Sequence, residues 1–300
     1  MADIPFLHTH DFQYGVIEPV SEGVRRLTAR NPGPFTFHGT GTYIVGEGEV
    51  AVIDPGPDDP GHVQALLDGL AKETISHIIV THCHQDHSPA ARPLQAATGA
   101  KTYGFGPHGH PGGDQAVHME EGIDLAFSPD ISVTDGDSIS GRNWELCCVH
   151  TPGHTSNHMC FSWEQHDLLF SGDHVMGWST TVIIPPDGNM TDYLTSLEKL
   201  RKRSDACLWP THGPPVTDPT LYILALIEHR LARIKAIREL LRTGTQRIND
   251  MVPSLYPDIQ PTLRTAAGLS TLASLEHLQR LGEVTALEDT GRGVLFSYTG

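Results

Sequence analysis

Four side chains that commonly bind metal ions lie within six residues of the sequence. His82, His84, Asp86 and His87 directly follow the apolar run Ile78-Ile79-Val80. Crowding such polar groups costs desolvation free energy unless a partner such as a divalent cation pairs with them. Alternate side chains of an extended chain point the same way, so the first two histidines can share one ion while Asp86 and His87 reach a second. Imidazole and carboxylate ligands suit zinc, and iron or manganese would also fit.

Four other stretches have a related form, in which an apolar strand ends at a polar side chain in a turn. The polar residues at these turns are Asp54, His154, Asp173 and His212. In a packed sandwich of sheets, such turns gather at one edge. This context favours a metal site over the competing interpretation of residues 81–87, a solvated histidine-rich loop.

This series resembles the signature of the metallo-β-lactamase superfamily in its order, spacing and strand-turn setting. The resemblance implies a hydrolase with two Zn²⁺ cofactors and a hydroxide bridging them. It also implies the metal ligands, which are His82, His84 and His154 for the first ion, Asp86, His87 and His212 for the second, and Asp173 as the bridge.

The implied chemistry is attack of the hydroxide on a carbonyl carbon or a phosphorus atom. Zinc lowers the pKa of bound water to about 7, which makes a nucleophile available at neutral pH. The resemblance places Asp54 behind the ligands, where it would hold a ligand histidine or the strand turn. Asp86 could also orient the hydroxide. His158 could donate to the developing oxyanion, as could Thr155 or His174, but His158 could equally be a buried supporting histidine.

Length and composition limit where this chain could work. The 300 residues contain no apolar run of membrane-spanning length, and the N-terminus lacks the features of a signal peptide. Five cysteines without paired spacing favour reduced thiols. We therefore expect no membrane contact and a cytoplasmic location, or the mitochondrial matrix in a eukaryote, which disfavours a secreted lactamase.

Charge separates the end of the chain from the rest. The net charge is −16, which disfavours nonspecific nucleic-acid binding by the whole surface. From residue 229 onward, however, the chain has nine Lys/Arg residues and seven Asp/Glu residues. The part before residue 229 has eleven Lys/Arg residues and twenty-nine Asp/Glu residues. The C-terminal part therefore differs in its electrostatics.

The periodicity of apolar residues predicts an α/β fold. Strands followed by outer helices predict the four-layer αββα sandwich of the superfamily over residues 1–220. Helices followed by a terminal hairpin predict a small winged-helix-like domain over 221–300. The predicted helices cover residues 62–72, 89–98, 192–202, 221–242, 246–252 and 270–281.

Two loops next to the predicted site allow more than one interpretation. His108 and His110 lie in a Gly/Pro/His segment, and we interpret it as a solvated loop rather than a source of ligands. Trp178 follows Asp173 and could line the substrate cleft or cover the core. Cys83 is expected to pack away from its neighbouring ligands.

The superfamily resemblance does not fix the bond that is cleaved. Motifs near residues 31–34 and 151–158 and the C-terminal pattern resemble the β-lactamase-like protein 2 branch, which includes a single-strand endoribonuclease. Acyl hydrolysis of a small ester, thioester or lactam is the leading hypothesis because the chain is acidic. The first alternative is cleavage of single-stranded RNA, and the second is a non-catalytic metal-containing binding protein. Separately, the C-terminal domain could form a homodimer contact. Basic residues on two helices favour RNA, namely Lys199, Arg201, Lys202, Arg203, Arg230, Arg233, Lys235, Arg238 and Arg242.

Overall fold

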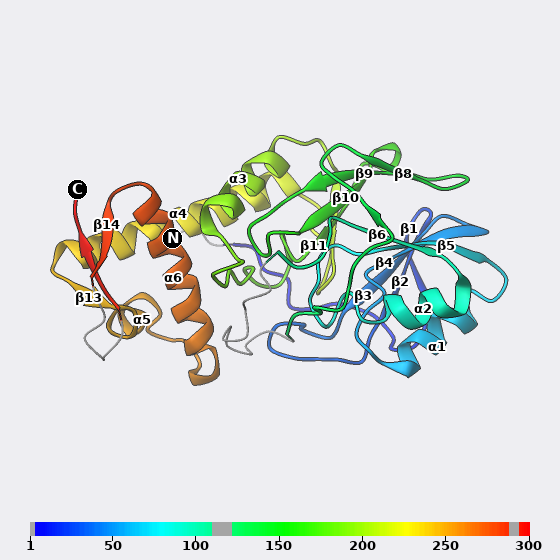
Figure 1. The fold of residues 1–300 in the computed structure, drawn as a ribbon, viewed down its shortest axis with the longest axis horizontal. Coiled ribbons are helices and arrows are strands. Elements are labelled where there is room, and N and C mark those ends of the chain that lie inside the picture. The colour runs from blue at the N-terminus through cyan, green and yellow to red at the C-terminus, as the bar shows by residue number, and fades with distance from the viewer. Residues whose placement is uncertain (1–3, 110–121, 288–293) are drawn as a thin grey trace.

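The structure is a computed structural model that describes residues 4–109, 122–287 and 294–300. A large part containing two sheets occupies one end of the molecule, and a smaller part made from the C-terminal segment occupies the other (Figure 1). One long helix, α4 (Pro219–Arg242), extends from the large part into the small one. In the described ranges, no helix combines the length and apolar character needed to cross a bilayer.

The first sheet contains seven strands that follow one another in chain order. Its first four strands pair antiparallel, and parallel pairs connect β4 through β7. Both faces of the central strands are covered, which explains why β3 is buried along its whole length rather than alternating. The strands are β1 (Glu18–Ser21), β2 (Val24–Thr28), β3 (Gly41–Val45), β4 (Glu49–Ile53), β5 (Thr74–Ile79), β6 (Lys101–Gly104) and β7 (Ile131–Ser132).

Two helices cover the outer face of this sheet. They are α1 (Pro60–Gly69), whose N-terminus is capped by the Asp59 side chain, and α2 (Ala91–Thr98). Leu66 of α1 and Leu94 of α2 are fully buried in one apolar cluster with the inner strands.

The second sheet has the spatial order β12-β11-β10-β9-β8, with one parallel pair between β11 and β12. Helices α3 (Met190–Arg201) and α4 pack on its outer side, where Leu197 and Ile223 join one apolar cluster with the sheet. Its strands are β8 (Ser138–Ser140), β9 (Glu145–His150), β10 (Met159–Trp163), β11 (Leu168–Gly172) and β12 (Cys207–Pro210).

The two sheets pack face to face over a second apolar core. Tyr43 and Ile79 of the first sheet meet Phe161 and Phe170 of the second, and all four side chains are almost completely buried. The layers therefore run helices, sheet, sheet, helices, and the predicted αββα sandwich is confirmed.

The C-terminal part contains two helices and a small antiparallel sheet of order β13-β15-β14. The predicted terminal hairpin and winged-helix arrangement are confirmed. Two predicted details are wrong. Residues 246 and 247 pair with β15 instead of starting a helix, and the last helix begins well before residue 270, where buried Ala266 and Ala267 extend its packed face. The elements are β13 (Gln246–Arg247), α5 (Ile248–Leu255), α6 (Arg264–Arg280), β14 (Val284–Leu287) and β15 (Leu295–Tyr298).

The packing between the sheets can be tested with a cavity-forming substitution. Phe161→Ala removes a fully buried ring and is expected to reduce the free energy of unfolding by about 3–5 kcal/mol. Leu221→Ala removes a side chain that is 64% exposed and is expected to change the free energy of unfolding by less than about 0.5 kcal/mol. Urea denaturation of both variants measures the difference. Equal midpoints for the two variants would contradict the described core.

Candidate metal centre

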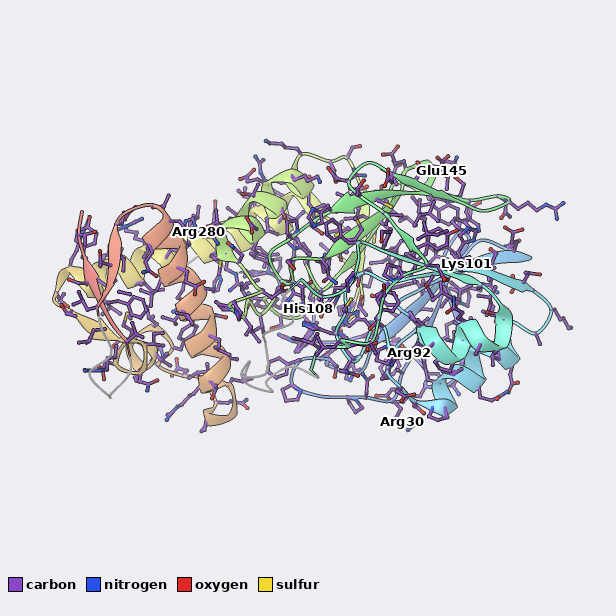
Figure 2. The ribbon with its side chains drawn as sticks, viewed as in Figure 1. Arg30, Arg92, Lys101, His108, Glu145 and Arg280 are labelled. Atoms are coloured by element: carbon purple, nitrogen blue, oxygen red, sulfur yellow. The ribbon has the colours of Figure 1, made fainter. Side chains whose placement is uncertain are left out.

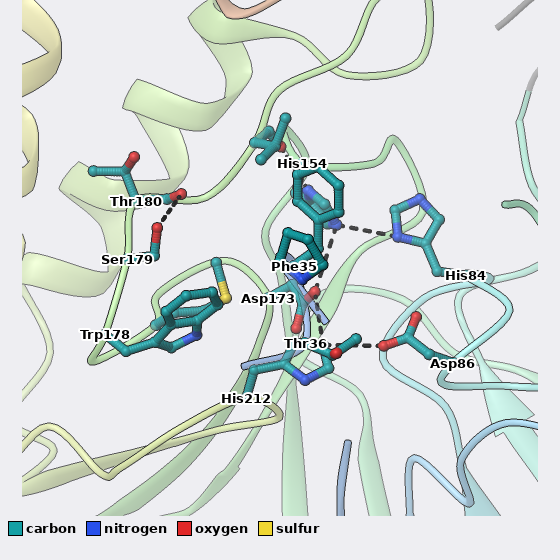
Figure 3. Close-up of a pocket in the computed structure, with 13 residues that line it drawn as sticks. Phe35, Thr36, His84, Asp86, His154, Asp173, Trp178, Ser179, Thr180 and His212 are labelled. Carbon is teal, nitrogen blue, oxygen red and sulfur yellow. Dashed lines mark hydrogen bonds and ion pairs between the residues drawn. The ribbon is translucent and has the colours of Figure 1, made fainter. Parts of the chain in front are cut away.

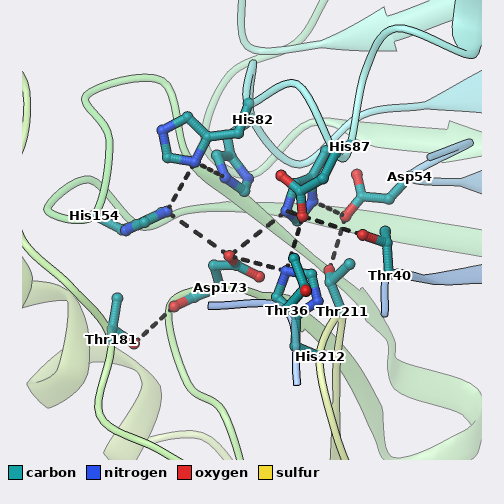
Figure 4. A network of polar contacts seen from close by, with 12 residues as sticks. Thr36, Thr40, Asp54, His82, His87, His154, Asp173, Thr181, Thr211 and His212 are labelled. Atoms are coloured by element: carbon teal, nitrogen blue, oxygen red, sulfur yellow. Dashed lines mark hydrogen bonds and ion pairs between the residues drawn. The ribbon is translucent and has the colours of Figure 1, made fainter. Parts of the chain in front are cut away.

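Polar side chains from separate strand ends converge at one edge of the sandwich (Figure 4). Glycines directly before two of them permit this close approach. A Cβ on Gly153, before His154, would lie 2.3 Å from Tyr193 Cα. A Cβ on Gly172, before Asp173, would lie 2.5 Å from His158 Nε2, and Gly172 has a positive φ of 53°.

Three histidines form a first group of converging ring nitrogens. His82 Nε2 lies 2.9 Å from His84 Nδ1, and His154 Nε2 lies 3.3 Å from the same atom. All three side chains are buried. This is the set that the sequence assigned to the first ion, and the structure brings it together.

A second group contains His87, Asp86 and His212. Asp86 Oδ2 lies 3.2 Å from His87 Nε2 and 3.0 Å from His212 Nε2. Asp173 stands between the two groups, because its Oδ2 lies 3.4 Å from His212 Nε2 and 3.9 Å from His154 Nε2. Asp173 is therefore within reach of both groups.

The opposite nitrogens of the histidine rings are held by the protein. His154 Nδ1 donates to the Val182 carbonyl at 2.8 Å, and His212 Nδ1 donates to the Gly39 carbonyl at 3.3 Å. In neutral rings, these bonds leave the Nε2 lone pairs directed at the centre. Contacts of this kind fix the tautomer and orientation of metal-binding histidines.

Asp54 organises the ligands from behind, as the sequence predicted. Its Oδ2 accepts from His87 Nδ1 at 2.9 Å and from the hydroxyls of Thr81 and Thr211 at 2.8 and 2.9 Å. Its Oδ1 accepts from the Thr81 backbone N–H at 2.8 Å. Because the Thr81 hydroxyl gives its hydrogen to Asp54, it accepts from His82 Nδ1 at 3.0 Å. One carboxylate therefore orients a histidine in each group.

Burial and neighbouring charges divide the histidines into two electrostatic classes. Burial, reinforced by adjacent histidines, holds the pKa of His82 and His84 well below the usual value. Burial also opposes a charge on His212, but the carboxylates of Asp173 and Asp86 outweigh it and raise the His212 pKa to about 10. The pKa of His87 is raised well above its usual value by the same balance. Protons on the second group thus balance carboxylate charge that a divalent cation would otherwise balance.

These residues fit a bound metal. Among the described residues, Asp173 Oδ1 is buried without a hydrogen-bond partner, and His87 Nε2 is buried beside Asp86 Oδ2 at 3.2 Å and Asp173 Oδ2 at 3.5 Å without forming a hydrogen bond of good geometry. The ring nitrogens of His82 and His84 that face each other would repel if both were unprotonated, because their lone pairs would meet. A proton or a cation between them removes this repulsion. Nitrogen and oxygen donors of this kind suit zinc or iron.

A small cavity of about 30 Å³ opens beside the ligands (Figure 3). Phe35, Met176 and Trp178 form its apolar wall, and Trp178 stacks on Phe37 with ring centroids 4.8 Å apart. Of the two interpretations of Trp178, the structure supports cleft lining. The full lining is Pro34, Phe35, Thr36, His84, Asp86, His154, Asp173, Met176, Trp178, Ser179, Thr180, Val182 and His212.

The residues considered as oxyanion donors lie behind the ligands instead. His158 is fully buried, its Nδ1 contacts the Thr151 hydroxyl at 2.8 Å, and its Nε2 accepts from the Asp173 backbone N–H at 3.2 Å. Both ring nitrogens of His158 are therefore engaged by the protein, which favours the buried supporting role over donation to a substrate. Thr155 and His174 are also buried and do not line the cavity.

The described part of the His/Gly loop, up to residue 109, differs at His108 from the prediction of a solvated segment. His108 is buried, with Nδ1 3.7 Å from Asp187 Oδ2, and Figure 2 labels it toward the middle of the molecule. Asp187 also accepts from the Ser156 backbone N–H at 2.9 Å, so it joins this loop to the turn after His154. His110 lies outside the described residues. Cys83 is buried as predicted, and Asn157 contacts its sulfur at 2.9 Å.

The threonines that support the site were missed at the sequence level. Thr40 donates to Asp86 Oδ2 at 3.1 Å, and Thr181 donates to the Asp173 carbonyl at 2.7 Å. For two others there was a signal, because Thr81 and Thr211 stand directly before His82 and His212.

The role of Asp54 can be tested with Asp54→Asn. The NH₂ group of asparagine would replace either Oδ1 or Oδ2 of Asp54. At the Oδ1 position it would face the Thr81 backbone N–H, and at the Oδ2 position it would face His87 Nδ1, so a donor would meet a donor in both cases. We expect zinc affinity to fall about 10–100-fold and the free energy of unfolding to fall by about 1–3 kcal/mol.

The matched control for this test is Asp59→Asn. Asp59 caps α1 through Oδ1, and asparagine caps helices equally well. Competition with a chromophoric chelator measures affinity for both variants. The assigned role is incorrect if the two variants bind zinc equally.

Two profiles match separate parts of the chain. The metallo-beta-lactamase superfamily profile covers residues 36–212, and the beta-lactamase associated winged helix domain profile covers residues 248–292. The Beta-lactamase-like protein 2 homolog of Caenorhabditis elegans is 30% identical over 84% of this chain and 82% of its own. An atrochrysone carboxyl ACP thioesterase of Aspergillus novofumigatus is 27% identical over 96% of this chain and 87% of its own.

Solved structures share the fold. A beta-lactamase domain protein from Burkholderia ambifaria has a TM-score of 0.81 at 20% identity and covers 96% of each chain. The protein TTHA1623, solved in a di-iron-bound form, has a TM-score of 0.51 at 27% identity and covers 68% of this chain and 96% of its own. The chain therefore belongs to the metallo-beta-lactamase superfamily of metal-dependent hydrolases.

Proposed function

We propose that this chain is a two-metal hydrolase of small acyl substrates, with thioesters as the leading class and esters and lactams as alternatives. The observation that carries this proposal is the wall of the cavity at the metal ligands. Among the lining residues that the structure describes there is no lysine or arginine, and Phe35, Met176 and Trp178 make one side apolar. Such a wall suits an uncharged acyl group better than a phosphate backbone.

In this proposal the two groups of ligands hold two ions with Asp173 between them. Zinc is the default ion, and iron and manganese are also compatible with these ligands. When bound, such ions polarise a substrate carbonyl and supply a hydroxide near neutral pH. The di-iron form of TTHA1623 supports a binuclear site in a relative of this fold.

The described side chains would orient the reacting groups rather than attack the substrate. Asp86, a member of the second group, is fixed by the Thr40 hydroxyl and lies 3.0 Å from His212 Nε2, which suits it to orient a nucleophilic water. Trp178 and Phe35 would pack against the acyl group and limit access of bulk water to the reacting carbonyl.

The name of the Aspergillus novofumigatus relative, an ACP thioesterase, supports thioesters over other acyl groups. A thioester carries no formal charge at the reacting carbonyl, in keeping with the cavity wall. A non-catalytic binding protein has less support, because all seven predicted ligand side chains are present and buried around one centre.

RNA cleavage has less support because the basic residues that favoured it are engaged within the protein. Arg230 is buried, and its guanidinium donates to the Thr181 carbonyl. Eight of the nine residues have protein partners, and five of these partners are carboxylates, so much of the basic charge on the two helices is balanced locally rather than available to a phosphate backbone. The pairs are Lys199 with Asp135, Arg201 with Glu198, Arg203 with Asp205, Arg230 with Thr181, Arg233 with Leu255, Lys235 with Glu239, Arg238 with Glu283 and Arg242 with Tyr298.

A parallel assay of zinc-loaded protein on uncharged thioesters, esters, β-lactams and labelled single-stranded RNA tests the proposal. We expect thioester hydrolysis that falls at least about 100-fold in Asp86→Ala, because a ligand to one ion is lost. Asp58→Ala removes an exposed carboxylate and controls for preparation and contaminating enzymes. The rate on an uncharged thioester is expected to be nearly constant between 50 and 200 mM salt, whereas binding through 6–10 phosphates would weaken about 10³–10⁵-fold.

Two results would overturn the acyl assignment. RNA cleavage that disappears in Asp86→Ala, without acyl turnover, would make the chain an endoribonuclease. Zinc-loaded protein that is inactive on every substrate would favour the binding-protein alternative.

A further inference from the structure

A buried arginine from the C-terminal extension contacts the loop that supports the metal ligands. Arg230 of α4 is 6% exposed, and its guanidinium lies 5.3 Å from the centre of the Tyr193 ring. One Nη donates to the carbonyl of Thr181, a buried residue of the loop that follows Asp173. Burying a guanidinium is costly unless it is well paired, so this position is expected to serve a specific contact.

Thr181 carries this contact to the ligand that lies between the two metal groups. Its hydroxyl donates to the backbone carbonyl of Asp173 at 2.7 Å and approaches the His174 carbonyl at 3.1 Å. Figure 4 shows the Thr181 side chain beside Asp173. The guanidinium therefore acts on the Asp173 backbone through a single residue.

The next residue of the same loop supports the first group of histidines. The Val182 carbonyl accepts from His154 Nδ1 at 2.8 Å and so directs His154 Nε2 at the centre. A second α4 side chain, Tyr222, donates to the Met176 carbonyl at 2.8 Å in the earlier part of the loop. Helix α4 thus holds this loop at two points, on either side of the cavity-lining residues Trp178 to Thr180.

We infer that Arg230 is a positioning residue of the metal centre. By fixing Thr181 and Val182, it sets the backbone of Asp173 and the ring orientation of His154. It contacts neither the reacting groups nor the ligand atoms. This inference rests on the proposed function, because it requires these side chains to hold metal ions.

The primary test is metal affinity in Arg230→Met, which keeps a long side chain but removes the charge and the donors. Groups behind metal ligands typically contribute about 10–100-fold to affinity. Because Arg230 acts through Thr181, we expect zinc to bind about tenfold more weakly. Competition with a chromophoric chelator measures this, and the absorption spectrum of the cobalt-loaded protein reports a changed ligand arrangement independently of activity.

Arg238→Met is the matched control. It makes the same substitution two turns further along α4, where Arg238 pairs with Glu283 of the C-terminal part. A general loss of helix stability or of domain packing would affect both variants, whereas the inference predicts altered metal affinity and cobalt spectrum for Arg230→Met alone. Thermal unfolding of each metal-free variant reports stability separately.

Thr181→Val provides a second route that leaves the guanidinium in place. It removes the hydroxyl that donates to Asp173 and keeps the carbonyl that accepts from Arg230. We expect a comparable loss of zinc affinity, and the double variant should lose less than the sum of the two effects because both act on one set of contacts. If Arg230→Met does not fold, Arg230→Lys and Thr181→Val are compared with the parent chain.

Zinc affinity within twofold of the parent and an unchanged cobalt spectrum, in Thr181→Val and in whichever Arg230 variant folds, would overturn the inference. A parent chain that binds no divalent metal would instead overturn the proposed function. The two failures are therefore distinguishable in one set of titrations.

Discussion

The structure must hold together a group of buried polar side chains that are unfavourable neighbours unless protons or cations balance them. Asp86 and Asp173 bring two carboxylates into an interior position, and the ring nitrogens of His82 and His84 face each other at 2.9 Å. The sandwich can hold such a group because its strands are rigid and end at one edge. The two apolar cores on either side of the first sheet supply that rigidity.

The precision of the site comes from contacts one step behind the ligands. The donors and acceptors include a carboxylate, backbone carbonyls and threonine hydroxyls, and they engage the ring nitrogens that face away from the centre. Threonine suits this task because a hydroxyl can accept from one group while donating to another, as Thr81 does between His82 and Asp54. The β-branched side chain also has few rotamers, so little freedom is lost when these bonds form.

The convergence of the predicted ligands could be anticipated from sequence because each is encoded locally. His82 to His87 are adjacent in the chain, and His154, Asp173 and His212 each follow an apolar strand, so short windows contain the signal. The αββα fold followed for the same reason, since its helices and strands show clear periodicity. Local signals also misled at the end of the helix predicted over residues 246–252, because α5 continues through Pro253 to Leu255, with Met251 and Val252 buried against neighbouring elements.

The features that could not be predicted depend on contacts between distant residues. His158 was ambiguous because its burial depends on the turn at Gly172, and His108 seemed solvated because Asp187 is far away in sequence. The paired state of the basic residues was also hidden. Arg238, for example, pairs with Glu283, which is 45 residues further along the chain and is brought close by the packing of the C-terminal part on α4. Spacing within one helix predicts which side chains share a face, but not what lies opposite that face.

The division of the chain into two domains likewise depends on contacts between distant residues. The two family profiles end at residue 212 and begin again at residue 248, so α4 belongs to neither, and a boundary at residue 220 stays a prediction. The helix nevertheless packs on α3 at one end and on α5, α6 and β15 at the other, and one apolar cluster extends across both parts. Because α4 also contacts the loop after Asp173, movement of the C-terminal part relative to the sandwich would disturb contacts near the ligands. The C-terminal part is therefore coupled by packing to the metal centre, although it supplies none of the predicted ligands.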